Sequence, residues 1–186
     1  MGNPNADAAG PGHQATIARV LADDGTFPNS PLPLVVFPGA IALAGEDPAR
    51  TIERTFSAHG WGGGWRNGIY GFHHYHSSAH EVLGVYRGSA RVQLGGERGI
   101  ALHIAAGDVV VIPAGVAHKN LGASLDLAVV GAYPDGQRVD MNYGKAGERP
   151  GADTRIAGVA LPRMDPVHGA DGPLLALWGT VRAGKP

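Results

Sequence analysis

Short apolar runs bounded by glycine, proline or serine follow one another through the middle of the chain. Valine, isoleucine and leucine dominate these runs, as they do in β-strands. Several short strands at nearly even spacing predict a sandwich or small barrel rather than parallel βαβ units. The predicted strands are residues 69–75, 81–86, 90–94, 100–104, 108–112 and 125–133.

Two further strands are predicted nearer the N-terminus. Residues 14–21 alternate between two sets of side chains, which is typical of an edge strand. Leu34–Phe37 is a continuous apolar run that ends at Pro38-Gly39, as a buried strand would. The pattern as a whole predicts an all-β fold.

One short helix is predicted over residues 48–59. Asp47 is a favourable N-cap, Pro48 suits the first helical position, and Gly60 can end the helix. Apolar side chains three and four residues apart form a single stripe, which should pack on the outside of a sheet. The stripe consists of Ala49, Ile52 and Phe56.

The two ends of the chain are expected to be less regular. The polar residues 1–14 predict a flexible tail, and the chain after Met141 has few periodic stretches. Its last apolar run, residues 174–178, is expected to dock on the barrel as part of an irregular segment. Residues 15–186 are therefore expected to form a single domain.

Composition suits a compact domain and gives no sign of a polyanionic partner. Hydrophobic residues make up 44% of the 186 residues, the net charge is −1, and lysine and arginine form no run. Neither nucleic acid nor a membrane is therefore expected as a partner. Residues 32–44 contain two prolines and are too short to cross a bilayer. The N-terminal segment lacks a basic region and an apolar signal core, so a cytoplasmic location is expected.

The chain has no cysteine, which excludes disulfides, thiolate nucleophiles and cysteine-bound zinc. Any metal site must therefore be built from imidazole and carboxylate. These ligands suit iron, manganese, nickel, copper or zinc, and nothing in the sequence selects among these metals.

Four side chains of these two kinds have a spacing that suggests one site. His74 and His76 lie two residues apart, and on a strand such residues share a face at roughly 6.5–7 Å. Glu81 follows five residues later, and His118 stands just after a Pro/Gly turn. The pattern predicts one divalent metal ion held by three histidines and a glutamate.

These residues resemble the two signature motifs of the cupin superfamily. The first motif is matched without exception at Gly68, His74, His76, Glu81 and Gly88. The second motif is matched at Gly107, Pro113, Gly115 and His118. It departs from the pattern at its closing asparagine, where this chain has Gly122 and the nearest asparagine is Asn120.

The motif core spans residues 68–122, and the wider context at 65–76 and 131–137 is similar to a small bacterial branch, the YjlB-like cupins. The resemblance implies a double-stranded β-helix, or jelly-roll barrel, with a metal near its mouth. It implies no substrate.

Two neighbouring histidines are alternative candidates. His73 lies one residue off the face of His74 and His76 and should point away from the metal. His80 precedes Glu81 and could replace it, although the spacing of the resembled family favours Glu81. Either residue could orient a ligand or relay a proton.

Other side chains are candidates for the pocket. Tyr70 and Phe72 share the parity of His74 and should line the cavity, unless both are simply core aromatics. Arg66 and Gln93 lie next to predicted strands and could bind an anionic substrate. Arg66 could equally cap a surface loop at its N-terminal side.

The predicted site favours a metal-dependent enzyme that acts on a small organic molecule. Three histidines and one glutamate leave about two positions of an octahedral ion open. Dioxygenase-type oxidation is favoured because an open site of this kind suits it and the resembled family often uses it. A non-catalytic metal- or small-molecule-binding cupin and a metal-dependent isomerase are the alternatives. No general acid or base is clearly placed outside the ligand set.

A homodimer is also expected. Residues 32–37 and 41–43 form an apolar stretch that is too long for one short helix to cover, so a second subunit is expected to bury it through the N-terminal strands. The alternative is that residues 174–178 fold back over the same surface.

Overall fold

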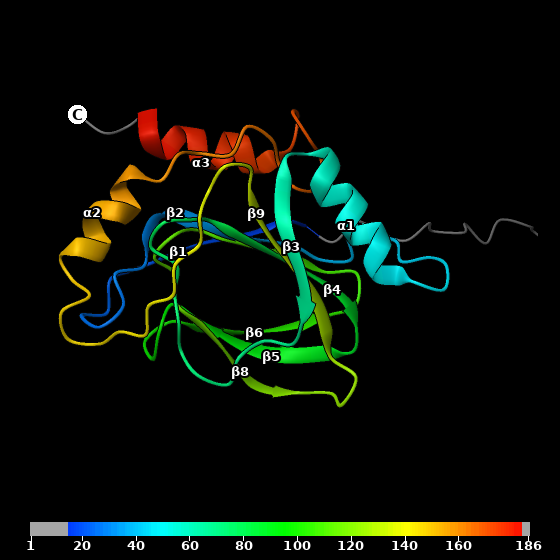
Figure 1. Cartoon of the computed structure of the whole chain (residues 1–186), viewed down its shortest axis with the longest axis horizontal. Helices are drawn as coiled ribbons and strands as arrows, with labels where there is room; N and C mark the ends of the chain where they lie inside the picture. The colour runs from blue at the N-terminus through cyan, green and yellow to red at the C-terminus, as the bar shows by residue number, and fades with distance from the viewer. Residues whose placement is uncertain (1–14, 184–186) are drawn as a thin grey trace, which may run out of the picture.

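The computed structural model describes residues 15–183, and the predicted tail at 1–14 lies outside this range. Its strands are β1 (Ile17–Leu21), β2 (Ser30–Phe37), β3 (Trp61–Asn67), β4 (Glu81–Arg87), β5 (Ser89–Leu94), β6 (Ile100–Ala105), β7 (Val109–Ile112), β8 (His118–Ala123) and β9 (Ala128–Pro134). They form a six-stranded sheet, in the order β1-β2-β7-β4-β9-β3, and a three-stranded sheet, in the order β6-β5-β8. All pairings are antiparallel, and the two sheets face each other (Figure 1). The predicted β fold is confirmed.

The six-stranded sheet is buried on both faces. Leu34, Leu83 and Val110 belong to an apolar cluster shared with the three-stranded sheet. Their neighbours Val35 and Val82 point to the other face and join a second cluster. Because successive side chains in a strand alternate between faces, two buried faces produce the continuous apolar runs seen in the sequence.

Two helices cover the outer face of the larger sheet, α1 (Pro48–Ala58) and α3 (Pro173–Ala183) (Figure 1). The predicted stripe of α1 is buried, and the helix contacts β3, β4 and β9. The close approach of α1 to β4 depends on Gly84, where an added Cβ would lie 2.6 Å from Ile52 Cγ2. The expected N-cap is not formed, because the Asp47 side chain makes no capping hydrogen bond and accepts hydrogen bonds from Arg66 instead.

The C-terminal part is more regular than predicted. It contains α2 (Gly151–Gly158) as well as α3, where irregular structure was expected. The N-terminus of α3 is capped from a distance, since the Leu174 N–H donates to the Asp165 carboxylate at 3.1 Å. The docking of residues 174–178 is confirmed: Trp178 is buried and donates from Nε1 to the Pro33 carbonyl at 2.8 Å.

Helix α3 therefore covers the apolar residues of β2 that were expected to be buried by a second subunit. A homodimer stays a prediction, and within the described residues β1 still leaves one edge of the larger sheet unpaired. No helix among residues 15–183 combines the length and the apolar character that crossing a bilayer requires.

The strand predictions were wrong in four places. Residues 69–75 form no strand, and only isolated bridges occur there, at His74 and Tyr75. The segment before Arg66, which was expected to be a surface loop, belongs to β3 and pairs with β9. Residues 125–127 precede β9, and β8 was not predicted at all.

Candidate metal centre

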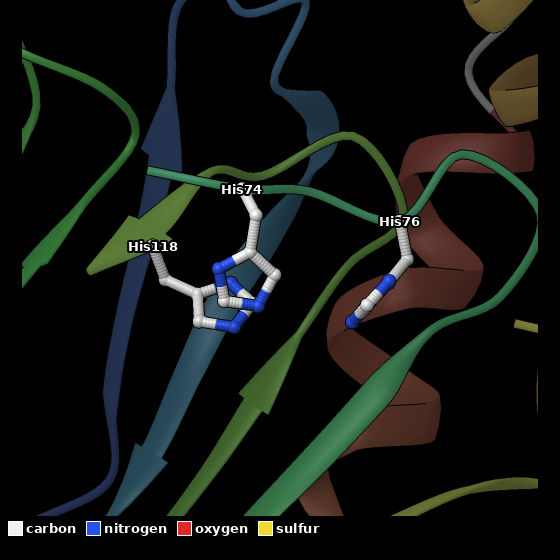
Figure 2. A group of neighbouring side chains, drawn as sticks. All are labelled: His74, His76 and His118. Atoms are coloured by element: carbon white, nitrogen blue, oxygen red, sulfur yellow. The ribbon is translucent and has the colours of Figure 1, made fainter. Parts of the chain in front are cut away.

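Three buried histidines converge on one point between the sheets. His74, His76 and His118 each offer a ring nitrogen, and these nitrogens all lie within 4.8 Å of one another. Figure 2 shows the rings of His74 and His118 side by side, with His76 reaching toward them from farther along the same segment as His74. The triad could hold a metal ion.

Glu81 lies against this triad. Its Oε1 is 3.5 Å from His76 Nε2, and its Oε2 is 3.3 Å from His118 Nε2. The carboxylate is almost fully buried, with 2% of the residue exposed. The structure thus brings together all four side chains that the sequence suggested as ligands.

The four side chains come from both sheets. Glu81 is the first residue of β4 in the larger sheet, and His118 is the first residue of β8 in the smaller one. His74 exchanges backbone hydrogen bonds with His118, at 3.2 and 2.9 Å. On the other side of the segment, Tyr75 exchanges two hydrogen bonds of 2.9 Å with Asn142. These bridges keep the local backbone extended without a regular strand, so the two-residue spacing still places His74 and His76 on one face.

Hydrogen bonds outside the triad orient His76. Its Nδ1 lies at hydrogen-bonding distance from the Asp140 carbonyl, which leaves Nε2 directed at Glu81. The Asp140 carboxylate accepts hydrogen bonds from the backbone N–H groups of Ser77, at 2.7 Å, and Ser78, at 3.2 Å. Asp140 therefore fixes the turn that follows His76. The contact between the Asp140 carbonyl and His76 Nδ1 selects the tautomer in which Nε2 is free to bind a metal.

Charge in the cluster is arranged around Glu81. Burial alone would raise the pKa of Glu81, but the adjacent His118 and His76 imidazoles hold the pKa well below its ordinary range. Burial also opposes a charge on His76, yet the Glu81 carboxylate raises the pKa of His76 above its usual value. Burial, followed by His118 and His76, lowers the pKa of His74 to about 3, so this imidazole is neutral and able to coordinate.

Two buried polar atoms of the cluster lack hydrogen bonds. Among the described residues, neither Glu81 Oε2 nor His118 Nδ1 has a hydrogen-bond partner. Buried polar atoms are normally satisfied, and an unpaired carboxylate oxygen is costly. A divalent cation would satisfy the carboxylate, and imidazole with carboxylate is a donor set that such ions accept. The residues present therefore fit a metal ion.

A cavity of about 330 Å³ opens onto the cluster. Outside the four candidate ligands it is lined by Trp65, Arg66, Asn67, Gly68, Ile69, Tyr70, Leu83, Tyr133 and Met141. Its polar end is the histidine and glutamate cluster, and most of its remaining wall is aromatic or aliphatic. The arrangement resembles a small-molecule pocket with a few convergent polar groups.

Tyr133 is a site residue that sequence reasoning missed. Its hydroxyl accepts a hydrogen bond of 2.8 Å from Trp65 Nε1. Burial raises the pKa of Tyr133 above its ordinary value, and the nearby Glu81 carboxylate raises it further. The residue lies in the 131–137 segment already noted for its resemblance to YjlB-like cupins, and this was the only signal available for it.

Two of the pocket candidates differ from expectation. Phe72 is outside the cavity lining and stacks on Tyr70 instead, with ring centroids 4.9 Å apart. Tyr70 and Phe72 are not core residues, because they are 48% and 47% exposed. Gln93 is also outside the lining, and its Nε2 donates to the Gly96 carbonyl at 2.9 Å.

Arg66 lines the cavity but is occupied. Its guanidinium donates to both oxygens of Asp47, at 3.0 Å each, and to both oxygens of Glu53, at 2.6 and 2.7 Å. Two carboxylates surround one cation, so the expected role in binding an anionic substrate has no support in this geometry.

The alternative histidines point elsewhere. His73 contacts Glu97, with Nε2 and Oε1 3.1 Å apart, and its ring lies against Phe27. His80 accepts a hydrogen bond of 3.0 Å at Nδ1 from the Ala114 N–H, and its ring lies 4.6 Å from that of Trp178. Neither belongs to the ligand cluster or lines the cavity that opens onto it.

Comparison with known proteins finds several to which this chain is similar. The uncharacterized protein YjlB of Bacillus subtilis (strain 168) is 46% identical over 157 residues, which cover 84% of this chain and 92% of that protein. A solved epimerase, RmlC of Legionella pneumophila in complex with dTDP-4-keto-L-rhamnose, matches 65% of this chain and 72% of its own, with 14% identity and a TM-score of 0.36.

The seed protein procruciferin, an 11S globulin of Brassica napus, matches 43% of this chain at 18% identity and a TM-score of 0.37. The match spans only 22% of the globulin. The family model for cupins matches residues 66–135, which include His74, His76, Glu81 and His118. With the identity to YjlB over most of both chains, this match shows that the chain belongs to the cupin family.

Proposed function

We propose that this cupin holds one divalent metal ion through His74, His76, Glu81 and His118 and oxidises a small organic molecule with dioxygen. The observation that carries the proposal is the buried cluster at the end of a cavity, with a carboxylate oxygen that no hydrogen bond satisfies. The proposed reaction needs a redox-active ion, which favours iron, manganese, nickel or copper over zinc among the metals that suit the donor set.

The residues of the chain divide into those that hold the ion and those that shape the space beside it. Bound there, such an ion would supply a Lewis acid and, if redox-active, a site for reaction with dioxygen. Leu83 and Ile69 line the cavity with aliphatic surface and exclude water. The Tyr133 hydroxyl, oriented by Trp65, offers a polar group at the cavity wall for a bound substrate.

The lining supports oxidation over isomerisation. A metal-assisted isomerisation moves a proton and requires a positioned general base. Among the described residues that line the cavity, every histidine and every carboxylate already belongs to the ligand cluster. No further histidine or carboxylate of this lining is left to act as a base, and burial raises the pKa of Tyr133, which makes its hydroxyl a poor base. The lining therefore disfavours the isomerase alternative.

The test combines metal analysis with oxygen uptake. Protein purified without added metal would be analysed for iron, manganese, nickel, copper and zinc, and then screened with a pool of small metabolites in an oxygen electrode. We expect a redox-active metal and uptake that depends on a component of the pool and disappears in His118→Ala. A bound metal with no uptake after loading with iron would instead support the non-catalytic binding protein.

A further inference from the structure

Exposed aromatic side chains gather beside the cavity. Tyr70, Phe72 and Tyr143, which we call the aromatic wall, are 48%, 47% and 42% exposed. Their two chain segments are joined by the bridge between Tyr75 and Asn142. Large apolar side chains grouped at the surface often mark a binding site.

Contacts between its rings order the aromatic wall, in which Tyr70 and Phe72 are stacked and Tyr143 is tilted. Phe72 lies nearly parallel to Tyr70, at an interplanar angle of 18°, and Tyr143 lies 6.0 Å beyond Phe72. The backbone of Tyr70 is also fixed, because the Asn120 N–H donates to its carbonyl at 2.8 Å. Only Tyr70 of the three lines the cavity, so Phe72 and Tyr143 support one ring that faces a ligand.

Tyr70 also connects the cavity wall to the candidate metal centre. Its ring meets that of His74 edge to face, with centroids 5.3 Å apart and an interplanar angle of 78°. A molecule resting against Tyr70 would therefore lie next to one of the proposed ligands. Planar rings favour such contacts, because stacked and edge-to-face arrangements add to the gain from burial.

The charge of the protein side chains in the cavity lining favours a neutral ligand over an anionic one. Arg66 is the sole cationic side chain among the described residues that line it, and Asp47 and Glu53 already engage that guanidinium. An anionic group on a ligand would find no unpaired lysine or arginine in the lining. A neutral molecule needs no cationic side chain to bind there.

We infer that the cavity binds a neutral, planar aromatic molecule of one or two rings, with a ring face against Tyr70. This inference rests on the proposed function, since it names the substrate class of the same site. The volume of about 330 Å³ agrees with a small ligand, because drug-sized pockets range from about 300 to 1,000 Å³.

The experiment measures binding by calorimetry, with three probes of similar size: phenol, cyclohexanol and benzoate. Each is titrated into metal-free and iron-loaded full-length protein, because benzoate can also coordinate an ion directly. Phenol should bind at least about 10-fold more tightly than cyclohexanol to both forms, and more tightly than benzoate to the metal-free form. Equal or weaker binding of phenol in either comparison would overturn the inference.

Two variants of one residue assign the preference to the ring. Tyr70→Leu should reduce the preference for phenol over cyclohexanol to less than about 3-fold, whereas Tyr70→Phe should retain it. Leu125→Ala, at a fully exposed position away from the cavity, serves as the control and should behave as wild type. A Tyr70→Leu protein that melts like wild type and keeps the full preference would contradict the inference.

Metal content separates this inference from the proposed function. Tyr70 is not a proposed ligand, so Tyr70→Phe, which keeps the ring against His74, should bind metal like wild type. A wild-type protein that takes up no metal would refute the metal site, while the preference for phenol could still be measured. A metal-loaded protein without that preference would refute the aromatic ligand alone.

Discussion

At the scale of single residues, the candidate centre depends on which ring nitrogen each histidine presents. The Asp140 carbonyl occupies His76 Nδ1, so Nε2 faces Glu81. His73, one residue before His74, contacts Glu97 at the opposite side of the segment. Neighbouring histidines in this chain therefore have different chemical roles.

Replacing His76 by alanine should remove most of the bound metal. The variant keeps three of the four proposed ligands and loses the contact with Asp140, and losing even a supporting contact typically weakens metal affinity about 10- to 100-fold. Elemental analysis after dialysis measures the occupancy. His73→Ala is the matched control and should retain the wild-type occupancy. Full occupancy in His76→Ala would show that the ligand assignment is wrong.

Metal binding should also be lost in acid. An imidazole must be deprotonated to coordinate, so protons compete with the metal as the pH falls. Burial opposes a charge on His76, but the Glu81 carboxylate raises the pKa of this histidine. The pKa of His74 is lowered, so His76 takes up a proton before His74 does. A bound cation lowers the pH at which its histidine ligands take up protons to below the ordinary pKa of about 6.5. Occupancy should therefore be full at neutral pH and fall between about pH 6 and 4. Constant occupancy down to about pH 3 in a dialysis series would argue against imidazole ligands.

At the scale of elements, the cavity wall is built by the pairing of β3 with β9. Trp65 pairs with Gly131, and a Cβ atom at Gly131 would overlap the indole ring. The same indole donates to Tyr133 at the cavity. Glycine at this position thus allows Trp65 to lie flat against β9 and hold the tyrosine hydroxyl.

A single added methyl group should disturb this contact. Gly131→Ala would push the indole away, and overpacking of this kind typically lowers the free energy of unfolding by about 1–3 kcal/mol. Urea unfolding followed by circular dichroism measures the change. Gly158→Ala is the control, because a Cβ there has no neighbour within 4 Å, and it should cause no loss of stability. If the two variants were equally stable, the proposed fit between Trp65 and Gly131 would be refuted.

The same elements show how far the sequence could predict the structure. The sequence spacing correctly predicted that four side chains lie close together, because hydrogen bonds on both sides keep residues 74–76 extended. These side chains are His74, His76, Glu81 and His118. The start of α3 was not predictable locally, since Leu174 is capped by Asp165 from outside the helix. Strand β3 was missed because glycines are poor strand formers, and its pairing with β9 overrides that preference.

Tyr133 could not be singled out for a related reason. Its role comes from a contact with Trp65, which lies on another strand and far away in the sequence. Conversely, the pairing of Arg66 with two carboxylates depends on where α1 packs, and the sequence alone left the arginine available for an anionic substrate.

At the scale of the whole molecule, α3 covers the apolar face of β2. Deleting residues 170–186 would remove Trp178 and Leu174, both buried against this face, and expose it to solvent. The truncated chain should associate or aggregate at micromolar concentration, because large exposed apolar patches drive association. Light scattering compares its mass with that of the full chain, whose monomer mass is 19.1 kDa.

The full-length protein provides the reference in that experiment. A mass of twice the monomer would support the predicted homodimer, which would then use a surface other than the one α3 covers, such as the free edge of β1. A truncated chain that remained folded at the monomer mass would contradict the covering role of α3.

The metal-to-protein ratio of the full-length protein tests the central claim most directly. The protein would be stripped of metal, titrated with iron(II) under nitrogen and with zinc(II) in air, and analysed after gel filtration. Four converging ligands predict saturation at about one ion per chain, and a variant with both His74→Ala and His118→Ala should retain almost none. A ratio near zero for the wild-type chain, or an unchanged ratio in the double variant, would contradict the metal centre proposed for this cupin.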